Sequence, residues 1–297
     1  MTISASMVKE LRQRTGAGMM ECKKALTETG GDMDAAIEQL RISGAAKADK
    51  KSDNTAAEGV VSIKLSASGD AYAIVEVNSQ TDFASKSEDF TGFVDQVTDL
   101  VLSQQPADVE TLSGMDLPSG GSVAETSKSL IAKIGENIQV RRFAAGKATG
   151  STLGQYSHSG RIGVICEIDG GDEDLAKDIA MHIAASKPVC VSEAEVPAEI
   201  LEKEKSILMA EAAESGKPEE IIEKMVQGRI RKYLADITLV GQPFVKDPDT
   251  SVEKLLSTNG AKVIGFTRFE VGEGIEKKEE NFADEVMAQV KDAEKDA

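Results

Sequence analysis

Hydrophobic residues at the start of the chain recur at the three- and four-residue spacing of amphipathic helices. The stretch SMVKELRQRT places Met7, Val8 and Leu11 on one face, and GMMECKKALTET and DMDAAIEQLRIS repeat this period. Gly44 is then a C-cap candidate, and the segment GAAKADKKSDNTAAEG that begins with it has no apolar period and predicts a linker. We therefore expect residues 1–55 to form a three-helix module with its linker, and the module to move semi-independently.

The middle of the chain uses one pattern twice. The first copy reads GVVSIKL, the turn SASGD, AYAIVEV and an amphipathic helix from about Glu88. The second reads GSTLGQYS, the turn HSG, RIGVICEI and the helix DEDLAKDIAMHIAAS. NIQVRRFAA and AKVIGFTRFEV add a later strand to each copy. The pattern predicts an α+β fold with two core subdomains, residues 56–142 and residues 143–189 with 239–273, each a three-stranded antiparallel sheet covered by helices.

Two long helical stretches interrupt the second copy. PAEILEKEKSILMAEAAES and PEEIIEKMVQGRIRKYLADI are joined by GK, and Pro218 suits a helix start. Their apolar residues have a coiled-coil-like spacing: Leu201, Leu208, Ala212, Ile222, Met225, Val226, Ile230 and Tyr233. The pattern predicts an antiparallel coiled-coil hairpin inserted at residues 190–238. A last amphipathic stretch, NFADEVMAQVKDA, predicts a C-terminal helical module at residues 274–297.

A phenylalanine stands inside a polar connection between a strand and a helix. In NSQTDFASKSEDF, Phe83 directly follows turn-forming residues. It is either an exposed contact for a partner or a core residue folded under its own helix. We favour the exposed position, because Phe90 and Phe93 already supply that helix with an apolar face. Asp82 is expected to cap the following helix or to accept a hydrogen bond from a partner.

Composition narrows the class of partner. The chain has 297 residues and a net charge of -17, which argues against a nucleic-acid backbone or an anionic membrane as the main partner. Its three cysteines form no CxxC, and neither a signal peptide nor an 18-residue apolar run is visible. These features favour a cytoplasmic protein that binds other proteins, without direct nucleic-acid or membrane binding.

The chain has few side chains in the arrangements that covalent catalysis or metal binding requires. Of its two histidines, His182 is expected to be packed within its helix, and His158 lies in a polar turn that is either solvated or in contact with a partner. Neither has the spacing of a metal site, so we expect no metal and no cofactor. Cys22 is a lone helical cysteine, and the turn TGAGMM lacks a complete phosphate-binding motif. The absence of a catalytic group favours a binding protein over an enzyme.

Met19 and Met20 follow the glycine-rich turn. Adjacent helical residues point about 100° apart, so both are hard to bury in so small a module. One of the two is therefore expected to face a partner.

Longer motifs then identify a family. LRQRTGAGMMECKKALTETGGDMDAAIEQLRISGAAKA, VNSQTDFASK, AKIGENIQVRR, HSGRIGVICEI, DIAMHIAASKP, GQPFV and RFEVGEGIEK strongly resemble, in order, the bacterial elongation factor Ts family. The resemblance implies a UBA-like (ubiquitin-associated-like) N-terminal module, two core subdomains, a coiled-coil hairpin and a C-terminal module. It also implies a guanine nucleotide exchange factor that promotes GDP release from the translational GTPase elongation factor Tu, in its GDP-bound and nucleotide-free forms. A homodimer or a 2:2 complex through the core or the hairpin is compatible with it.

The resemblance carries contact positions onto this chain. It implies contacts near the helices that organise Mg²⁺ in the GTPase, contacts with its nucleotide-binding domain, and one contact with another domain. The contacts near the Mg²⁺-organising helices are Thr81, Asp82 and Phe83. The contacts with the nucleotide-binding domain are Leu11, Arg12, Met19, Met20 and Lys23. His158 is the contact with another domain, and Ile134 and Gly135 are further contacts. Ser79 stands where family members often have cysteine, and PADVETLSGMDLPSGGSVAETS, within residues 104–126, is expected to be a variable loop.

Two other classes of function stay open on the sequence. A UBA-like module alone suggests an adaptor for helical or ubiquitin-like partners, with the core as a passive scaffold. An enzyme would use Cys22 or Cys166 as nucleophile, and it would need a nearby base that the sequence does not offer.

Overall fold

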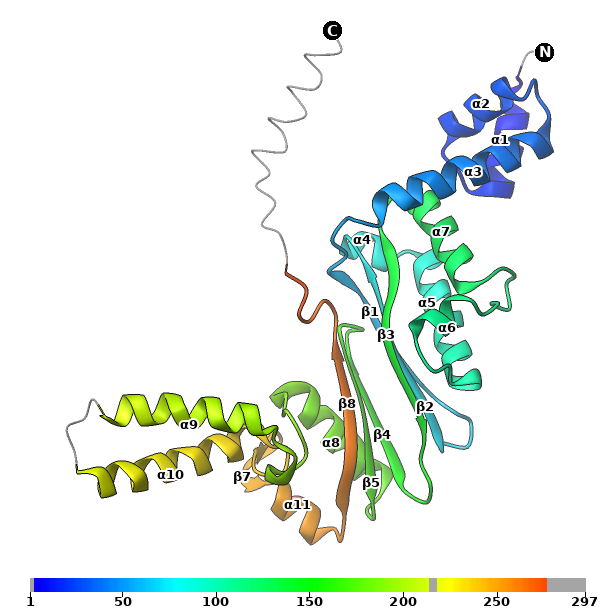
Figure 1. The fold of residues 1–297 in the computed structure, drawn as a ribbon. Helices are drawn as coiled ribbons and strands as arrows, with labels where there is room; N and C mark the ends of the chain where they lie inside the picture. Colours follow the sequence, from blue (N-terminus) through cyan, green and yellow to red (C-terminus); the bar gives the residue numbers. More distant parts are fainter. Residues whose placement is uncertain (1–2, 214–217, 277–297) are drawn as a thin grey trace.

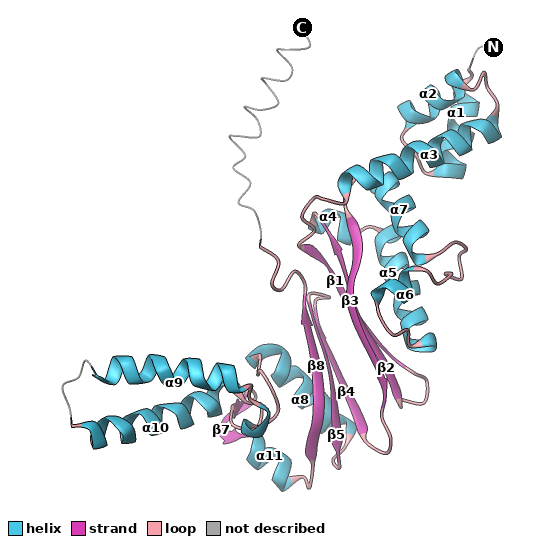
Figure 2. Cartoon of the chain, in the orientation of Figure 1, coloured by secondary structure: helices cyan, strands magenta, loops and turns pink. Residues whose placement is uncertain are grey.

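The computed structural model describes residues 3–213 and 218–276. Figure 1 shows a helical module at the N-terminal end, two sheets in the middle and a helical hairpin that projects from the second sheet's side of the molecule. Figure 2 shows that helices cover the outer sides of the sheets. The predicted helix in residues 274–297 lies almost entirely outside the described residues. None of the described helices has the length of apolar sequence that a bilayer crossing needs.

Three helices form the N-terminal module: α1 (Ala5–Thr15), α2 (Met19–Glu28) and α3 (Met33–Lys51). The Ser4 hydroxyl accepts a hydrogen bond from the Met7 N–H at the start of α1, and the Asp32 carboxylate accepts one from the Ala35 N–H at the start of α3. The apolar faces meet in a small core of buried residues: Val8, Leu11, Cys22, Ala25, Leu26 and Ala36. The predicted three-helix module is confirmed.

The predicted flexible linker, residues 44–59, is wrong over its first half, because α3 continues as far as Lys51. Gly44 does not end the helix; it lets α3 pack closely on α7 (Val123–Ile134), since a Cβ there would lie 3.0 Å from the Cβ of Ala132. Beyond it, Ala48 is buried against the first core, and Lys128 pairs with Asp49 at 3.0 Å. Alanine and lysine favour helix, and these contacts with α7 and the first core add tertiary packing to that local preference. The module is therefore joined to the core by a continuous helix.

The first sheet has the strand order β1-β2-β3 and is antiparallel, with β1 (Glu58–Leu65), β2 (Ala71–Ser79) and β3 (Ile138–Lys147). Helices α5 (Glu88–Gln104), α6 (Val109–Ser113) and α7 cover one face. The predicted subdomain boundary after residue 142 cuts through β3, which pairs with β2 as far as Lys147. The predicted variable loop contains α6 and contributes Leu112 and Leu117 to the core, where both are buried.

The second sheet has the order β4-β5-β8 and is also antiparallel, with β4 (Thr152–His158), β5 (Ile162–Asp169) and β8 (Lys262–Glu270). Helix α8 (Glu173–Ser186) covers it, and α11 (Val252–Thr258) follows the short strands β6 (Pro243–Phe244) and β7 (Asp247–Ser251). A separate apolar cluster lies between the two sheets: Val61, Ile74, Leu153, Ile165 and Val271. Gly163 permits this approach, because a Cβ there would lie 2.5 Å from Val61. Both predicted three-stranded sheets are confirmed.

Helices α9 (Ala198–Ala213) and α10 (Glu219–Ile237) form the predicted hairpin. Its seam buries Leu208, Ala212 and Val226, with Ile222 and Ile230 packed against them. A short 3₁₀ turn, η1 (Glu193–Glu195), precedes α9. His182 of α8 is fully buried at the base of this hairpin, as predicted. The His182 Nδ1 accepts a hydrogen bond from the Val245 N–H at 3.2 Å, and the His182 Nε2 lies 3.0 Å from Gln242 Oε1.

Candidate partner-binding face

Phe83 projects into solvent from a short helix. It is the second residue of α4 (Asp82–Ser85), which follows β2, and its side chain is 82% exposed. The alternative of a core position under its own helix is wrong. Phe90 and Phe93 occupy that place, at 0% and 3% exposed.

Thr81, rather than Asp82, caps this helix. The Thr81 hydroxyl accepts a hydrogen bond from the Ala84 N–H at 3.3 Å, and the Ser85 hydroxyl donates to the Asp82 carbonyl at 2.9 Å. The expectation that Asp82 caps the helix after it is wrong, because Ser87 caps α5. The Asp82 carboxylate instead pairs with Lys86 at 2.6 Å, and this hydrogen bond lowers the pKa of Asp82 below its ordinary value.

Glu136 and Asn137 hold the turn from behind. The backbone N–H and the hydroxyl of Thr81 donate to the two carboxylate oxygens of Glu136, at 2.9 and 2.7 Å. The Asn137 N–H donates to Gln80 Oε1 at 2.8 Å. The Asn137 side chain donates to the carbonyls of Ser52 and Asn54, just after α3, at 3.1 and 2.8 Å. The N-terminal helices, the α7–β3 turn and the Phe83 turn are therefore tied together.

Ile134 and Gly135 have structural roles in this arrangement. Gly135 has a left-handed backbone, with φ of 87°, and ends α7. The reversal brings the next residue, Glu136, to Thr81. Ile134 is half-buried and packs against the first core. The structure thus places both predicted contact positions next to the Thr81–Phe83 turn.

Four of the five predicted contacts in the N-terminal module are exposed. Met19 is 59% and Met20 74% exposed, and Arg12 and Lys23 are exposed on the same module. Leu11 differs from the other four, because it is 0% exposed and fills the centre of the module core.

The glycine-rich turn of the module rests on the end of α7. A Cβ at Gly16 would lie 3.0 Å from Lys133 Cε, and Lys133 pairs with Asp89 at 2.7 Å. Lys133 is adjacent to the Ile134 and Gly135 positions. The motifs GAGMM, KIGEN and TDF, distant in sequence, are therefore neighbours along one side of the first subdomain.

His158 lies at the exposed end of β4. Its Nδ1 is 3.4 Å from the Tyr156 hydroxyl, and the two rings stack with centroids 6.4 Å apart. The turn that follows is joined to β1, because the Val61 N–H donates to the Gly160 carbonyl at 2.7 Å and Arg161 pairs with Glu58 at 2.6 Å. The positive charge of Arg161 also contributes to the lowered pKa of Asp82, after the hydrogen bond from Lys86.

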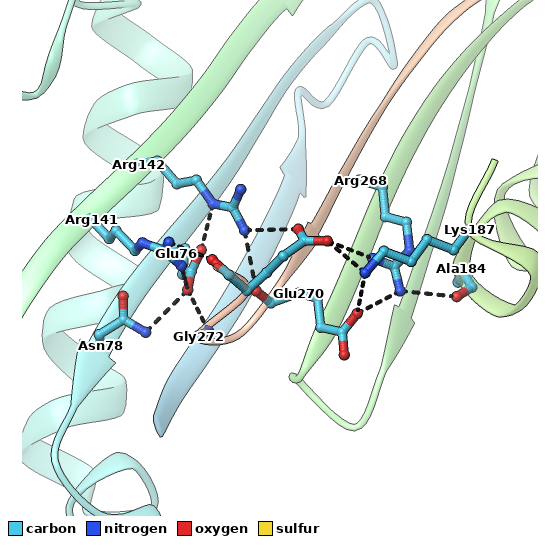
Figure 3. A network of polar contacts seen from close by, with 10 residues as sticks. Glu76, Asn78, Arg141, Arg142, Ala184, Lys187, Arg268, Glu270 and Gly272 are labelled. Carbon is cyan, nitrogen blue, oxygen red and sulfur yellow. Dashed lines mark hydrogen bonds and ion pairs between the residues drawn. The ribbon is translucent and has the colours of Figure 1, made fainter. Parts of the chain in front are cut away.

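Sequence reasoning missed a buried carboxylate that joins the two sheets. Glu76 in β2 is 0% exposed; it pairs with Arg141 and Arg142, and its Oε1 accepts a hydrogen bond from the Gly272 N–H at 2.8 Å (Figure 3). Burial acts to raise the pKa of Glu76, but the hydrogen bonds from Gly272, Arg142 and Asn78 outweigh it, and the pKa is lowered. A glutamate inside the apolar run AYAIVEV was the available signal.

The described residues contain no cluster of three or more His, Cys, Asp or Glu side chains arranged to hold a metal ion. The candidate site is a protein surface: an exposed aromatic ring on a hydrogen-bonded turn, with exposed methionines on the N-terminal module.

Comparison with known proteins decides the family. The sequence profile described as Elongation factor TS matches residues 80–273. Elongation factor Ts of Thioalkalivibrio sulfidiphilus (strain HL-EbGR7) is 65% identical over 294 residues, which cover 99% of this chain and 100% of that protein. The chain belongs to the elongation factor Ts family.

Other members of the elongation factor Ts family agree over the same length. The proteins of that name from Alkalilimnicola ehrlichii and Methylococcus capsulatus are 61% and 58% identical, each over 98% of this chain and 99% of its own length. The predicted family, the α+β fold and the role as a guanine nucleotide exchange factor in polypeptide elongation are confirmed.

Proposed function

We propose that this chain releases GDP from elongation factor Tu by inserting Phe83 as an apolar wedge between side chains of the GTPase. The 82% exposure of Phe83 on a hydrogen-bonded turn is the observation that carries the proposal. An aromatic ring in water gains free energy when a complex buries it. Membership of the elongation factor Ts family supplies the partner and the reaction.

The wedge acts on the Mg²⁺ site of the partner. Entry of the ring shifts a helix that helps to hold Mg²⁺, and the loss of those contacts weakens GDP. Linkage then requires that GDP weakens the binding of this chain by the same factor. The GDP-bound form is therefore the form that the chain acts on, and the nucleotide-free form is the one it binds more tightly.

The remaining exposed positions extend the contact. Met19, Met20, Arg12 and Lys23 dock on the nucleotide-binding domain of the GTPase, and His158 meets another domain. The net charge of -17 disfavours direct contact with nucleic acid. A protein with this partner works in the cytoplasm.

No covalent chemistry is part of the proposal. Cys166, one of the two cysteines considered as a nucleophile, is fully buried, and burial raises the pKa of its thiol to about 12. Its Sγ donates to the Ala176 carbonyl at 3.1 Å. Cys22 is also 0% exposed, in the core of the N-terminal module. Neither thiol is accessible to a substrate, since both are buried.

Release of labelled GDP from purified elongation factor Tu, with and without this chain, tests the function. Phe83→Ala is expected to slow the catalysed release at least about tenfold, which corresponds to roughly 1.4 kcal/mol of barrier. Its melting temperature should stay within about one degree of the original, because an exposed side chain contributes little to stability.

A matched control is Ile264→Ala, which removes another exposed apolar side chain, 54% exposed, near the start of β8. This variant should keep normal exchange. Normal exchange in Phe83→Ala would contradict the wedge.

A further inference from the structure

Phe83 lies on a helix that is too short to be stable alone. α4 has four residues, and a single helical turn is unfavourable in isolation. Its conformation therefore depends on tertiary contacts: Ala84 and Ser85 are buried, and Thr81, the residue before the helix, is hydrogen-bonded to Glu136. Thr81 is the N-cap whose hydroxyl accepts from the Ala84 N–H.

Glu136 fixes Thr81 at two points. One carboxylate oxygen accepts from the Thr81 N–H at 2.9 Å, and the other accepts from its hydroxyl at 2.7 Å. The hydroxyl thus donates to Glu136 and accepts from Ala84 at once, which leaves it one orientation. Hydrogen bonds to an ionised carboxylate are stronger than those between neutral groups. Together with the burial of Ala84 and Ser85, the Glu136 carboxylate therefore fixes the direction in which α4, and Phe83 on it, leave the surface.

Glu136 is itself held on a rigid frame. The left-handed Gly135 turns the chain back at the end of α7, and the Asn137 N–H is bonded to Gln80 Oε1. The Asn137 side chain is bonded to the Ser52 carbonyl beyond α3. Each of these contacts joins a different segment of the first subdomain. The frame positions the carboxylate before any partner binds.

We propose that Glu136 is a positioning residue for nucleotide exchange: its carboxylate holds the Thr81 turn so that Phe83 meets the GTPase in a preset orientation. This inference rests on the proposed wedge function. A turn that is ordered in advance spares the complex the entropy of ordering it. An interaction that serves the exchange step more than initial binding changes the maximal rate more than the half-saturating concentration.

The first experiment measures GDP release over a range of concentrations of this chain. Glu136→Ala should lower the maximal rate about tenfold and change the half-saturating concentration by less than about threefold. Glu136→Gln keeps one acceptor and should recover part of the rate. Glu125→Ala is the matched control, because Glu125 lies in the first turn of α7, at the opposite end of that helix from Glu136, and accepts from the Ser122 N–H. Its exchange should be normal.

The second experiment reads the turn directly, without the GTPase. The chain has no tryptophan, so Phe83→Trp introduces a single fluorophore on α4. In this background Glu136→Ala should lower the fluorescence anisotropy of the free chain, because the tryptophan gains local motion. Glu125→Ala should leave the anisotropy unchanged.

The third experiment asks whether Glu136 acts through Phe83. The double variant Phe83→Ala with Glu136→Ala should be no slower than Phe83→Ala alone, since the ring to be positioned is already absent. Multiplied losses in the double variant would overturn the proposal. So would an unchanged anisotropy or an unchanged maximal rate in Glu136→Ala. GDP release by the unsubstituted chain tests the proposed function separately, so its absence is distinguished from a failure of the positioning role.

Discussion

Met20 is the residue of the N-terminal module on which a contact is tested most simply. It is 74% exposed and takes no part in the module core, so its truncation should leave the fold intact. Met20→Ala is expected to weaken binding to elongation factor Tu by about 1–3 kcal/mol if its side chain is buried in the complex. Isothermal titration calorimetry measures the change.

Met209→Ala is the control for Met20, because Met209 is 41% exposed on the hairpin helix α9. It should bind as the original chain does. An unchanged dissociation constant for Met20→Ala would remove the module's methionine from the interface.

Single residues were predicted well where their neighbours in sequence decide their environment. Phe83 is exposed because Phe90 and Phe93 already fill the core below it. The feature that was missed has a tertiary cause: the Glu136 carboxylate finds Thr81, a partner 55 residues away. The spacing of hydrophobic residues along the chain does not predict a hydrogen bond between two polar residues so far apart in sequence.

At the scale of elements, the hairpin of α9 and α10 can be removed without disturbing the candidate partner-binding face around Phe83. Its base is closed by backbone pairing, since the Val189 N–H donates to the Ile237 carbonyl at 2.8 Å and the Leu239 N–H to the Cys190 carbonyl at 2.9 Å. Excision of residues 197–234 with a short glycine closure should therefore leave the sheets folded and GDP release detectable. Complete loss of release, with an unchanged circular dichroism signature of the sheets, would place an exchange determinant in the hairpin.

The strands of both three-stranded sheets and the helices α1, α2, α5, α8, α9 and α10 followed from periods of two and of 3.6 residues. Helix α6 and the start of α7 lie in the predicted variable loop and did not, and the extension of α3 is a further exception. Residues 45–51 have no apolar period, yet they are helical, because Gly44 and Ala48 pack on α7. With a flexible tether, we expected the N-terminal module to raise affinity more than it drives nucleotide release. The continuous α3 removes that reason and permits the module to act on the Phe83 turn as well.

At the scale of the whole molecule, Glu76 stabilises the joint between the two sheets (Figure 3). It binds Arg141 and Arg142 within the first sheet and the Gly272 N–H beyond the second. Glu76→Gln leaves two arginines without their carboxylate. It should lower the free energy of unfolding at neutral pH by about 2–4 kcal/mol. Thermal or urea unfolding measures it, with Glu110→Gln, an exposed glutamate of α6, as the unaffected control.

The stability difference between the original chain and Glu76→Gln depends on pH, in a direction set by the shifted pKa of Glu76. The pKa of Glu76 is lowered in the folded chain from its ordinary value of 4.5. Its stabilisation is therefore fully present above pH 4.5 and is lost as the pH falls through the lower, folded-state pKa. The stability difference between the original and Glu76→Gln should be constant near neutrality and shrink in acid. A difference that grew on acidification would contradict this assignment.

Helix α3 also fixes a length and an angle between the exposed methionines and Phe83. Its 19 residues correspond to about 28 Å, and each added residue would advance the module by about 1.5 Å while rotating it by about 100°. One inserted residue would thus turn Met20 away from its original direction although the distance hardly changed. An insertion of about seven residues, close to two full turns, would restore the direction but lengthen the span by about 10 Å. A partner must therefore match the direction in which α3 presents Met20 relative to Phe83, as well as the chemistry of the two side chains.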